Sequence, residues 1–309
     1  MAGRPFARYA WLVTGFTVLV ILWGAVVRAT GSGAGCGNHW PTCNGQIIPQ
    51  PEQIETLIEF IHRLTSGLSG LLVLALAVWA FRAGWATRFT RRAAALALLF
   101  MMVEALVGML LVRLELVADN ASTTRAVVIA LHLVNTLALL ASLALTAWSA
   151  SGQRISLQGK PRRLAGLLGL ALAGMVLLSA AGAVTALGDT LFPPESLIAG
   201  LQQDLDATAH FLIRLRVIHP AIALLVSAFL LVAGQEFLAA SATARRPVIA
   251  MYALVILQIA AGFVNVILLA PVWMQVLHLL LADSLWLALV LVAAEALAAE
   301  GASPAAHPA

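Results

Sequence analysis

Charged residues are scarce in this chain, and their scarcity excludes a large class of proteins. Asp, Glu, Lys and Arg make up 10% of its 309 residues, whereas 61% of the residues are hydrophobic. Soluble domains carry roughly a quarter charged residues, so this composition excludes a soluble globular protein. We therefore expect an integral membrane protein surrounded by membrane lipid.

Cysteine is almost absent as well. The two cysteines, Cys36 and Cys43, lie in a Gly-rich connection after the first apolar stretch, and the later connection at 189–212 has none. A disulfide would persist there in an oxidising compartment, and closing so short a loop would contribute roughly 2 to 3 kcal/mol. A structural staple and an exposed, redox-active pair both stay open at this point.

Apolar stretches dominate the rest of the chain, and eight of them are long enough to cross about 30 Å of hydrocarbon as helices. They cover about 9–28, 57–81, 93–113, 126–149, 164–187, 213–234, 247–270 and 274–298. The first has the basic start of a signal peptide, but its apolar run is too long, so we expect it to be retained. The predicted fold class is an all-α integral membrane protein.

Basic residues mark alternate connections between these stretches. They are Arg4, Arg8, Arg82, Arg88, Arg91, Arg92, Arg154, Lys160, Arg162, Arg163, Arg245 and Arg246. Because Lys and Arg accumulate in short cytoplasmic loops, we predict a multi-pass protein of the cell membrane with both termini in the cytoplasm. The basic runs then face anionic lipid, and we assign no nucleic-acid partner.

The second half of the chain echoes the first. Matched pairs are Gly24-Ala25-Val26 with Gly182-Ala183-Val184, Ile61-His62 with Ile218-His219, Glu104 and Gly108 with Gln258 and Gly262, and Leu131-His132-Leu133 with Leu277-His278-Leu279. A shift by four helices preserves direction, so we predict two pseudo-symmetric four-helix bundles, 1–150 and 164–309. Residues 151–163 form the predicted cytoplasmic linker between them.

Four histidines share one depth in this arrangement. His62, His132, His219 and His278 each lie a few residues inside the outer end of a predicted helix. Ionisable side chains are costly there and usually have a functional partner. Two imidazoles in each bundle are the number that ligates or encloses one heme. The histidines left out of this site are His39, His210 and His307, which lie in loops or in the polar tail.

Glu59 breaks the repeat. It lies three residues before His62, on the same helical face, whereas Arg216 occupies the matched position before His219. A partly desolvated carboxyl group can move protons, so we predict a reaction site in the first bundle and a fixed cofactor site in the second. The alternative is an interfacial ion pair between Glu59 and Arg63. For Glu104, the matched Gln258 favours hydrogen bonding over proton transfer.

Taken together, these residues resemble heme A synthase, the membrane enzyme that oxidises heme O to heme A. The resemblance is carried by the cysteine pair and by Glu59-Phe60-Ile61-His62-Arg63, Leu131-His132-Leu133-Val134-Asn135-Thr136, Ile218-His219-Pro220 and Leu277-His278-Leu279. It covers essentially the whole chain. It implies that a ring methyl of heme O is oxidised to a formyl group, which supplies heme A to terminal cytochrome oxidase.

The same resemblance implies roles for individual residues. His219 and His278 would bind the iron of a heme b cofactor, His62 and His132 would hold the iron of the substrate heme O, and Glu59 would take part in catalysis. Expected partners are the farnesyltransferase that makes heme O and the oxidase assembly machinery. Some family members carry a second cysteine pair in the later connection. That pair is missing here, so a redox relay in the second bundle stays open. A homo-oligomer also stays open.

The sequence leaves alternatives for the role of five arginines and for the function of the protein. Five arginines at outer helix ends could pair with heme propionates or serve only as interfacial anchors: Arg28, Arg63, Arg125, Arg214 and Arg216. The rival functions are a diheme electron-transfer cytochrome, which would have no task for Glu59, and a metal or proton transporter. Against transport, the histidine layer lies near one surface rather than at the midplane.

Overall fold

Eight long helices form the protein. The computed structural model describes residues 3–50 and 53–299, and in these ranges eight helices are long and apolar enough to span a membrane. They are α1 (Gly3–Ala29), α2 (Ile54–Arg82), α3 (Arg88–Arg113), α4 (Thr123–Trp148), α5 (Arg162–Leu191), α8 (Ile218–Ala240), α9 (Arg245–Ile267) and α10 (Val272–Ala296). The predicted all-α fold of a multi-pass membrane protein is confirmed.

Shorter helices complete the described chain. They are α6 (Leu197–Leu205), α7 (Phe211–Arg214) and three 3₁₀ turns, η1 (Ser32–Ala34), η2 (Ser149–Ser151) and η3 (Ala242–Ala244). The span predicted at 213–234 lies within the observed span Phe211–Ala240, in which residues 215–217 separate α7 from α8. Pro220 accounts for the break: it has no N–H to donate back to Arg216, so it is tolerated only in the first turn of α8. His219 therefore lies in that first turn.

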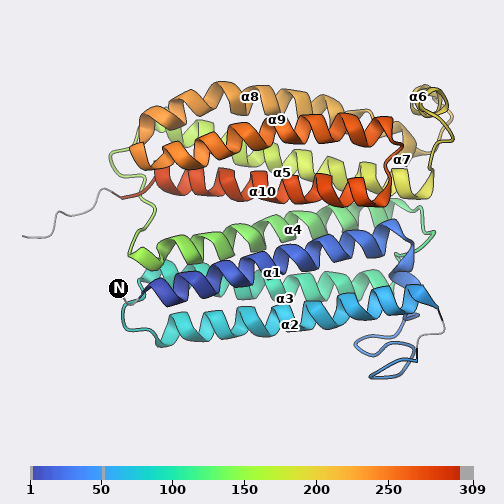
Figure 1. Ribbon diagram of the computed structural model, residues 1–309, viewed down its shortest axis with the longest axis horizontal. Coiled ribbons are helices and arrows are strands. Elements are labelled where there is room, and N and C mark those ends of the chain that lie inside the picture. The colour runs from blue at the N-terminus through green and yellow to red at the C-terminus, as the bar shows by residue number, and fades with distance from the viewer. Residues whose placement is uncertain (1–2, 51–52, 300–309) are drawn as a thin grey trace, which may run out of the picture.

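The spanning helices gather into two groups (Figure 1). We call α1 to α4 the first group and α5, α8, α9 and α10 the second group. Helix α4 packs against both α5 and α10, and α1 packs against α10. Val18, Leu137 and Leu140 of the first group belong to the same buried cluster as side chains of α5, α8, α9 and α10. The groups thus share part of their core, although the first group also has a buried cluster of its own around Phe6 and Leu76. The internal repeat with its division at 151–163 stays a prediction.

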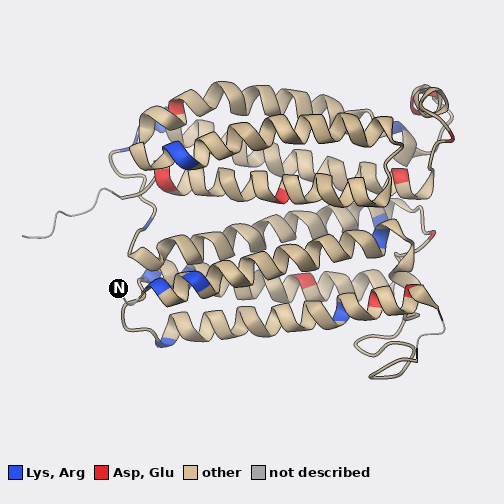
Figure 2. Cartoon of the chain, in the orientation of Figure 1, with Lys and Arg blue, Asp and Glu red and all other residues tan. Residues whose placement is uncertain are grey.

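The two ends of the helical array differ in charge. Helix α1 begins and α10 ends at the same end of the molecule (Figure 1), and Lys and Arg gather toward that end (Figure 2). This is the pattern that cytoplasmic termini require, and the orientation itself stays a prediction. His307 lies outside the described residues.

Polar contacts join the two groups at two depths. Near the end of the helical array opposite the termini, Arg28 of α1 donates hydrogen bonds to the Ala186 carbonyl of α5 (2.6 Å) and to Gln275 Oε1 of α10 (2.7 Å). Deeper in the membrane, the indole N–H of Trp286 on α10 donates to the Leu137 carbonyl of α4 (2.7 Å). These contacts fix how α10 faces the first group.

Asp283 is a buried acid that the sequence analysis passed over. It lies three residues before Trp286 on α10, is 1% exposed, and its Oδ2 has no hydrogen-bond partner in the described chain. The signal was visible in the sequence, because Asp283 is the acid near the middle of the apolar run 274–298, with Glu295 near its end. A carboxyl group at this depth is costly, and it therefore has to be covered by neighbouring helices.

Candidate functional site

Two histidines of the second group lie opposite each other. The ring centroids of His219 on α8 and His278 on α10 are 6.4 Å apart, and their planes are inclined by 82°. Two metal–imidazole bonds of about 2 Å, with roughly 1.2 Å from each nitrogen to its ring centre, add to about the same length. The separation therefore fits bis-imidazole ligation of one iron, and both rings are half-buried.

The ring nitrogens of this pair have defined partners. His219 Nδ1 lies 3.3 Å from the Leu178 carbonyl, which can only accept, so Nδ1 carries the proton and Nε2 keeps its lone pair. That is the tautomer of a typical metal-binding histidine. His278 Nε2 lies 3.2 Å from the amide nitrogen of Gln258, a donor. Gln258 thus occupies the lone pair that iron would take, and it has to move when a heme binds.

The first group presents a different arrangement. Glu104 Oε2 of α3 lies 2.9 Å from Nδ1 of His132 on α4, and Thr136 Oγ1 donates to Glu104 Oε1 (2.7 Å). The hydrogen bond to the carboxyl group comes from Thr136, whereas His132 Nδ1 lies at ion-pair distance from it without hydrogen-bond geometry. With Nδ1 facing Glu104, His132 has Nε2 left for another partner.

Glycines make room for three of the four imidazoles. A Cβ added to Gly24 would lie 3.0 Å from His62 Cε1, and one added to Gly182 would lie 2.9 Å from His219 Cε1. At Gly262 the corresponding distance to His278 Cε1 would be 3.3 Å. The Gly-Ala-Val echo of the sequence thus falls where α1 and α5 each pass a histidine, and any side chain there would push on the ring.

We expect Gly182→Ala to disturb His219, because the new methyl group overlaps the ring and overpacking costs about 1–3 kcal/mol. A heme held by His219 should then show a weakened or altered low-spin absorption spectrum. Gly169→Ala is the matched control, since it makes the same change on the same helix where no atom lies within 4 Å. Equal spectra for the two variants would contradict the expectation.

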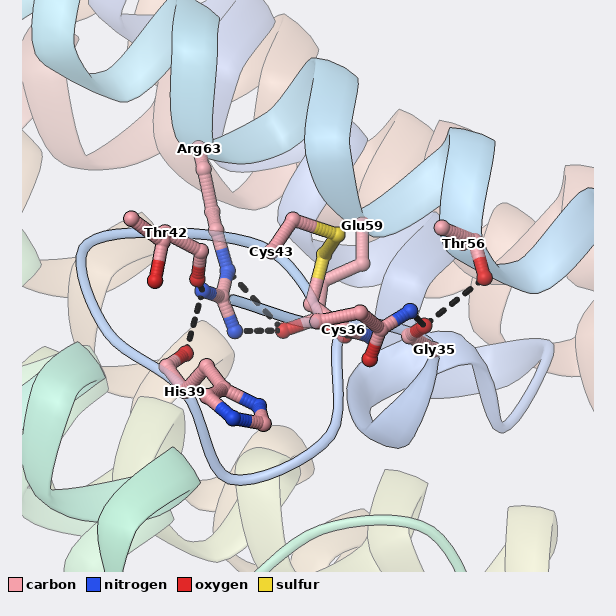
Figure 3. Close-up of polar contacts among 9 residues, drawn as sticks. Gly35, Cys36, His39, Thr42, Cys43, Thr56, Glu59 and Arg63 are labelled. Atoms are coloured by element: carbon pink, nitrogen blue, oxygen red, sulfur yellow. Dashed lines mark hydrogen bonds and ion pairs between the residues drawn. A yellow bond between two sulfur atoms is a disulfide. The ribbon is translucent and has the colours of Figure 1, made fainter. Parts of the chain in front are cut away.

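Glu59 is held by the outer loop that carries the cysteines (Figure 3). It is 3% exposed, and its Oε2 accepts a hydrogen bond from the Cys36 N–H (2.7 Å). Its Oε1 accepts from Nε of Arg63 (3.1 Å), and Arg63 also donates to the carbonyls of His39 (2.6 Å) and Thr42 (2.7 Å). The ion pair with Arg63 is therefore formed. The hydrogen bonds of Glu59 go to Cys36 and Arg63, not to His62.

The disulfide between Cys36 and Cys43 is formed, with their Cα atoms 4.4 Å apart. The two residues are 0% and 1% exposed, so the exposed pair, one of the two alternatives left open by the sequence, is not the arrangement found. The loop folds over the bridge onto the start of α2, where Thr56 Oγ1 donates to the Gly35 carbonyl (2.7 Å). A thiol reagent would thus reach the sulfur atoms only after the loop opens.

We expect the double variant Cys36→Ser/Cys43→Ser to lower the thermal unfolding midpoint. Losing the bridge removes roughly 2 to 3 kcal/mol of loop-closure stabilisation. The heme content of the second group should stay the same, because the described hydrogen bonds of the loop to Thr56, Glu59 and Arg63 all lie in the first group. An unchanged midpoint would contradict the staple, and loss of turnover in a folded, heme-loaded variant would favour a redox relay.

The arginines proposed for heme propionates differ in their surroundings. Arg125 is buried and donates to the Asn120 carbonyl (2.8 Å). Arg216 is buried too, with Nε 3.1 Å from Asp189 Oδ1. Arg214 is exposed. The remaining two, Arg28 and Arg63, make the contacts described above. A propionate would have to compete with protein acceptors at the buried arginines, and propionate binding stays a prediction.

Helix α6 reaches Arg216, and it was missed by the sequence analysis. Ser196 caps it, because its Oγ accepts from the Ala199 N–H (3.2 Å), and this capping residue before Leu197 was the available signal. Asp204 near its end is 3.6 Å from Nη1 of Arg216. Burial raises the pKa of Asp204, and the positive charge of Arg216 opposes that rise.

Comparison with known proteins identifies the family. The model of the cytochrome oxidase assembly protein family matches residues 7–290. The chain belongs to this family. A protoheme IX farnesyltransferase of Thermus thermophilus is 52% identical to this chain over 304 residues, which is 96% of the chain and 49% of the relative. The chain thus spans about half the length of that relative.

Relatives named heme A synthase match a shorter part of this chain. The protein from an Exiguobacterium species is 40% identical over 105 residues, covering 34% of the chain and 35% of the relative. The one from Halalkalibacterium halodurans is 47% identical over 91 residues, covering 29% of the chain and 30% of the relative. The resemblance to the heme A synthase family predicted from the sequence is confirmed.

Proposed function

We propose that this chain is a heme A synthase, an oxidoreductase that converts a ring methyl of heme O to a formyl group and supplies heme A to terminal cytochrome oxidase. The observation that carries the proposal is the match of the cytochrome oxidase assembly protein family over residues 7–290. The relatives named heme A synthase and the paired imidazoles of the second helix group support it.

In this proposal the second group, within residues 164–309, holds heme b through His219 and His278. Such a heme supplies one-electron transfer when bound. The protein's contribution is to orient the ligands. The Leu178 carbonyl sets the tautomer of His219, Gly182 and Gly262 leave room for the two rings, and Gln258 yields its place on His278.

The first group, within residues 1–150, takes heme O as substrate. His62 and His132 face its iron, with Glu104 behind His132. Glu59 accepts a proton during oxidation of the methyl group, because its carboxyl group is removed from bulk water yet held in one position by Cys36 and Arg63. The disulfide loop, in this role, is the support that keeps Glu59 in place.

The proposal also assigns surroundings and partners. The chain lies in the cell membrane with cytoplasmic termini, and its histidines lie toward the outer face. Its substrate comes from a farnesyltransferase, since heme O is a farnesylated heme, and the Thermus relative bears the name of such an enzyme. Oxidase assembly factors receive the product.

Extraction of hemes decides between this proposal and its rivals. Membranes containing the chain and supplied with heme O should yield heme A by chromatography, and membranes with His62→Ala/His132→Ala should yield heme O alone. A diheme cytochrome would return its hemes unchanged from both. A simple transporter would show no Soret band in the purified protein.

A further inference from the structure

The two helix groups place different side chains next to His132 of α4 and His278 of α10. In the first group a carboxyl group, Glu104 Oε2, lies 2.9 Å from His132 Nδ1. In the second group the matched residue is Gln258. Its amide nitrogen lies 3.2 Å from the other ring nitrogen, Nε2 of His278. A carboxylate can only accept a proton or hydrogen bond, whereas the amide nitrogen of Gln258 donates. The carboxylate thus presents an acceptor to His132, whereas the uncharged amide presents a donor to His278.

We propose that Glu104 is a positioning residue for the substrate heme: it fixes His132 with Nδ1–H toward the carboxylate and Nε2 toward the iron, and makes this imidazole a stronger electron donor than His278. The inference rests on the proposed function, because it takes His132 as a ligand of the iron. A carboxylate behind a ligating histidine fixes the tautomer and raises the basicity of the ring.

Thr136 adjusts the strength of this effect. Its hydroxyl donates to Glu104 Oε1 (2.7 Å), so part of the carboxylate's negative charge is shared away from His132. The single hydroxyl proton of Thr136 is shared with a second acceptor, the His132 carbonyl one turn back on α4, which lies 2.9 Å from Oγ1 and keeps the hydroxyl beside the pair. Glu104 thus has one oxygen for the imidazole and one for the hydroxyl.

The direction of the consequence follows from charge. A more electron-rich imidazole stabilises ferric over ferrous iron, so the first-group heme should have a lower midpoint potential than it would with a neutral residue at 104. Glu104→Gln reproduces the amide of the second group without changing size. We expect it to raise the midpoint potential of the first-group heme and to weaken heme binding there by about 10- to 100-fold.

The experiment uses the full chain purified in detergent and loaded with ferric protoheme as the probe. The first-group heme is the one lost in His62→Ala/His132→Ala, and its potential is measured by spectroscopic redox titration. Glu115→Gln is the matched control, because it removes an exposed carboxyl group just beyond the outer end of α3. It should leave both potentials and both affinities unchanged.

Thr136→Val provides an independent test with the opposite sign. Without the hydroxyl, the full carboxylate charge faces His132, so the potential should fall, provided that Glu104 acts through its charge. A role in packing alone would not give opposite shifts in the two variants. If Glu104→Gln does not fold, the Thr136→Val result stands alone, and a potential that rises or stays the same overturns the proposal.

Failure of this inference differs from failure of the proposed function. If heme binds and is lost in His62→Ala/His132→Ala, yet Glu104→Gln leaves its potential unchanged, the role of Glu104 is overturned while the substrate site stands. If no heme is lost in that double variant, His132 is not a ligand, and both the substrate site and this inference are overturned.

Discussion

Changing His219 to alanine is expected to remove the low-spin heme spectrum of the purified protein or to convert it to a high-spin one. The imidazoles of His219 and His278 are separated by the distance that one iron with two axial ligands requires. Losing either ring leaves a single ligand and an open position, because alanine has no donor atom. His278→Ala should therefore give the same result, as measured by absorption spectra of the oxidised and reduced protein.

The control for this experiment is His210→Ala. His210 lies before α7, where its ring accepts a hydrogen bond from the Leu212 N–H (3.3 Å) and stacks near Phe192 and Phe211. Its loss affects the outer loop, so the heme spectrum should persist. A His219→Ala protein with an unchanged low-spin spectrum would remove His219 from the set of ligands.

Glu59→Gln should stop the formation of heme A while the protein still folds and keeps the heme of the second group. Glutamine preserves the size of the side chain and can still accept the hydrogen bond from Cys36, but it cannot take up a proton. General base catalysis typically contributes about 10²- to 10⁴-fold, so heme A formation should fall by that order. Cells expressing the variant should accumulate heme O or a partly oxidised heme, as measured by chromatography of extracted hemes.

Glu55→Gln is the comparison for Glu59→Gln. Glu55 lies one turn earlier on α2 and is half-buried, so the same chemical change is made beside the same loop. Heme A should form normally in this variant. Wild-type levels of heme A in Glu59→Gln would exclude Glu59 from the reaction and would leave it only its ion pair with Arg63.

Local sequence signals were sufficient to predict where the spanning helices lie. They were insufficient to predict where a helix is interrupted or ends. Length and hydropathy mark each span because a membrane requires about 20 apolar residues. The break between α7 and α8 depends on Pro220, which a hydropathy pattern counts only as one more residue. The end of α9 was placed too late, because Leu269 and Ala270 are apolar yet have positive φ angles that end the helix.

The site was predictable as far as residue types in matched positions could indicate it. The four histidines and Glu59 stand out because polar residues are rare in apolar runs. What they contact was beyond the sequence, since it depends on how separate helices pack. Nothing local indicates that Glu59 binds the Cys36 N–H, that Gln258 lies on His278, or that the disulfide is covered by its own loop.

The buried acid on α10 has a consequence for biogenesis. An aspartate at the centre of a membrane-inserting helix costs about 2.5 to 3.5 kcal/mol, which the leucines and valines around Asp283 offset in part. Asp283 is 1% exposed in the finished fold, where α10 packs against α9, α4, α1 and α5, all of which are synthesised earlier. Docking of α10 among these helices is thus the step that withdraws Asp283 from lipid, and removing helices against which α10 packs should leave it poorly inserted and open to degradation.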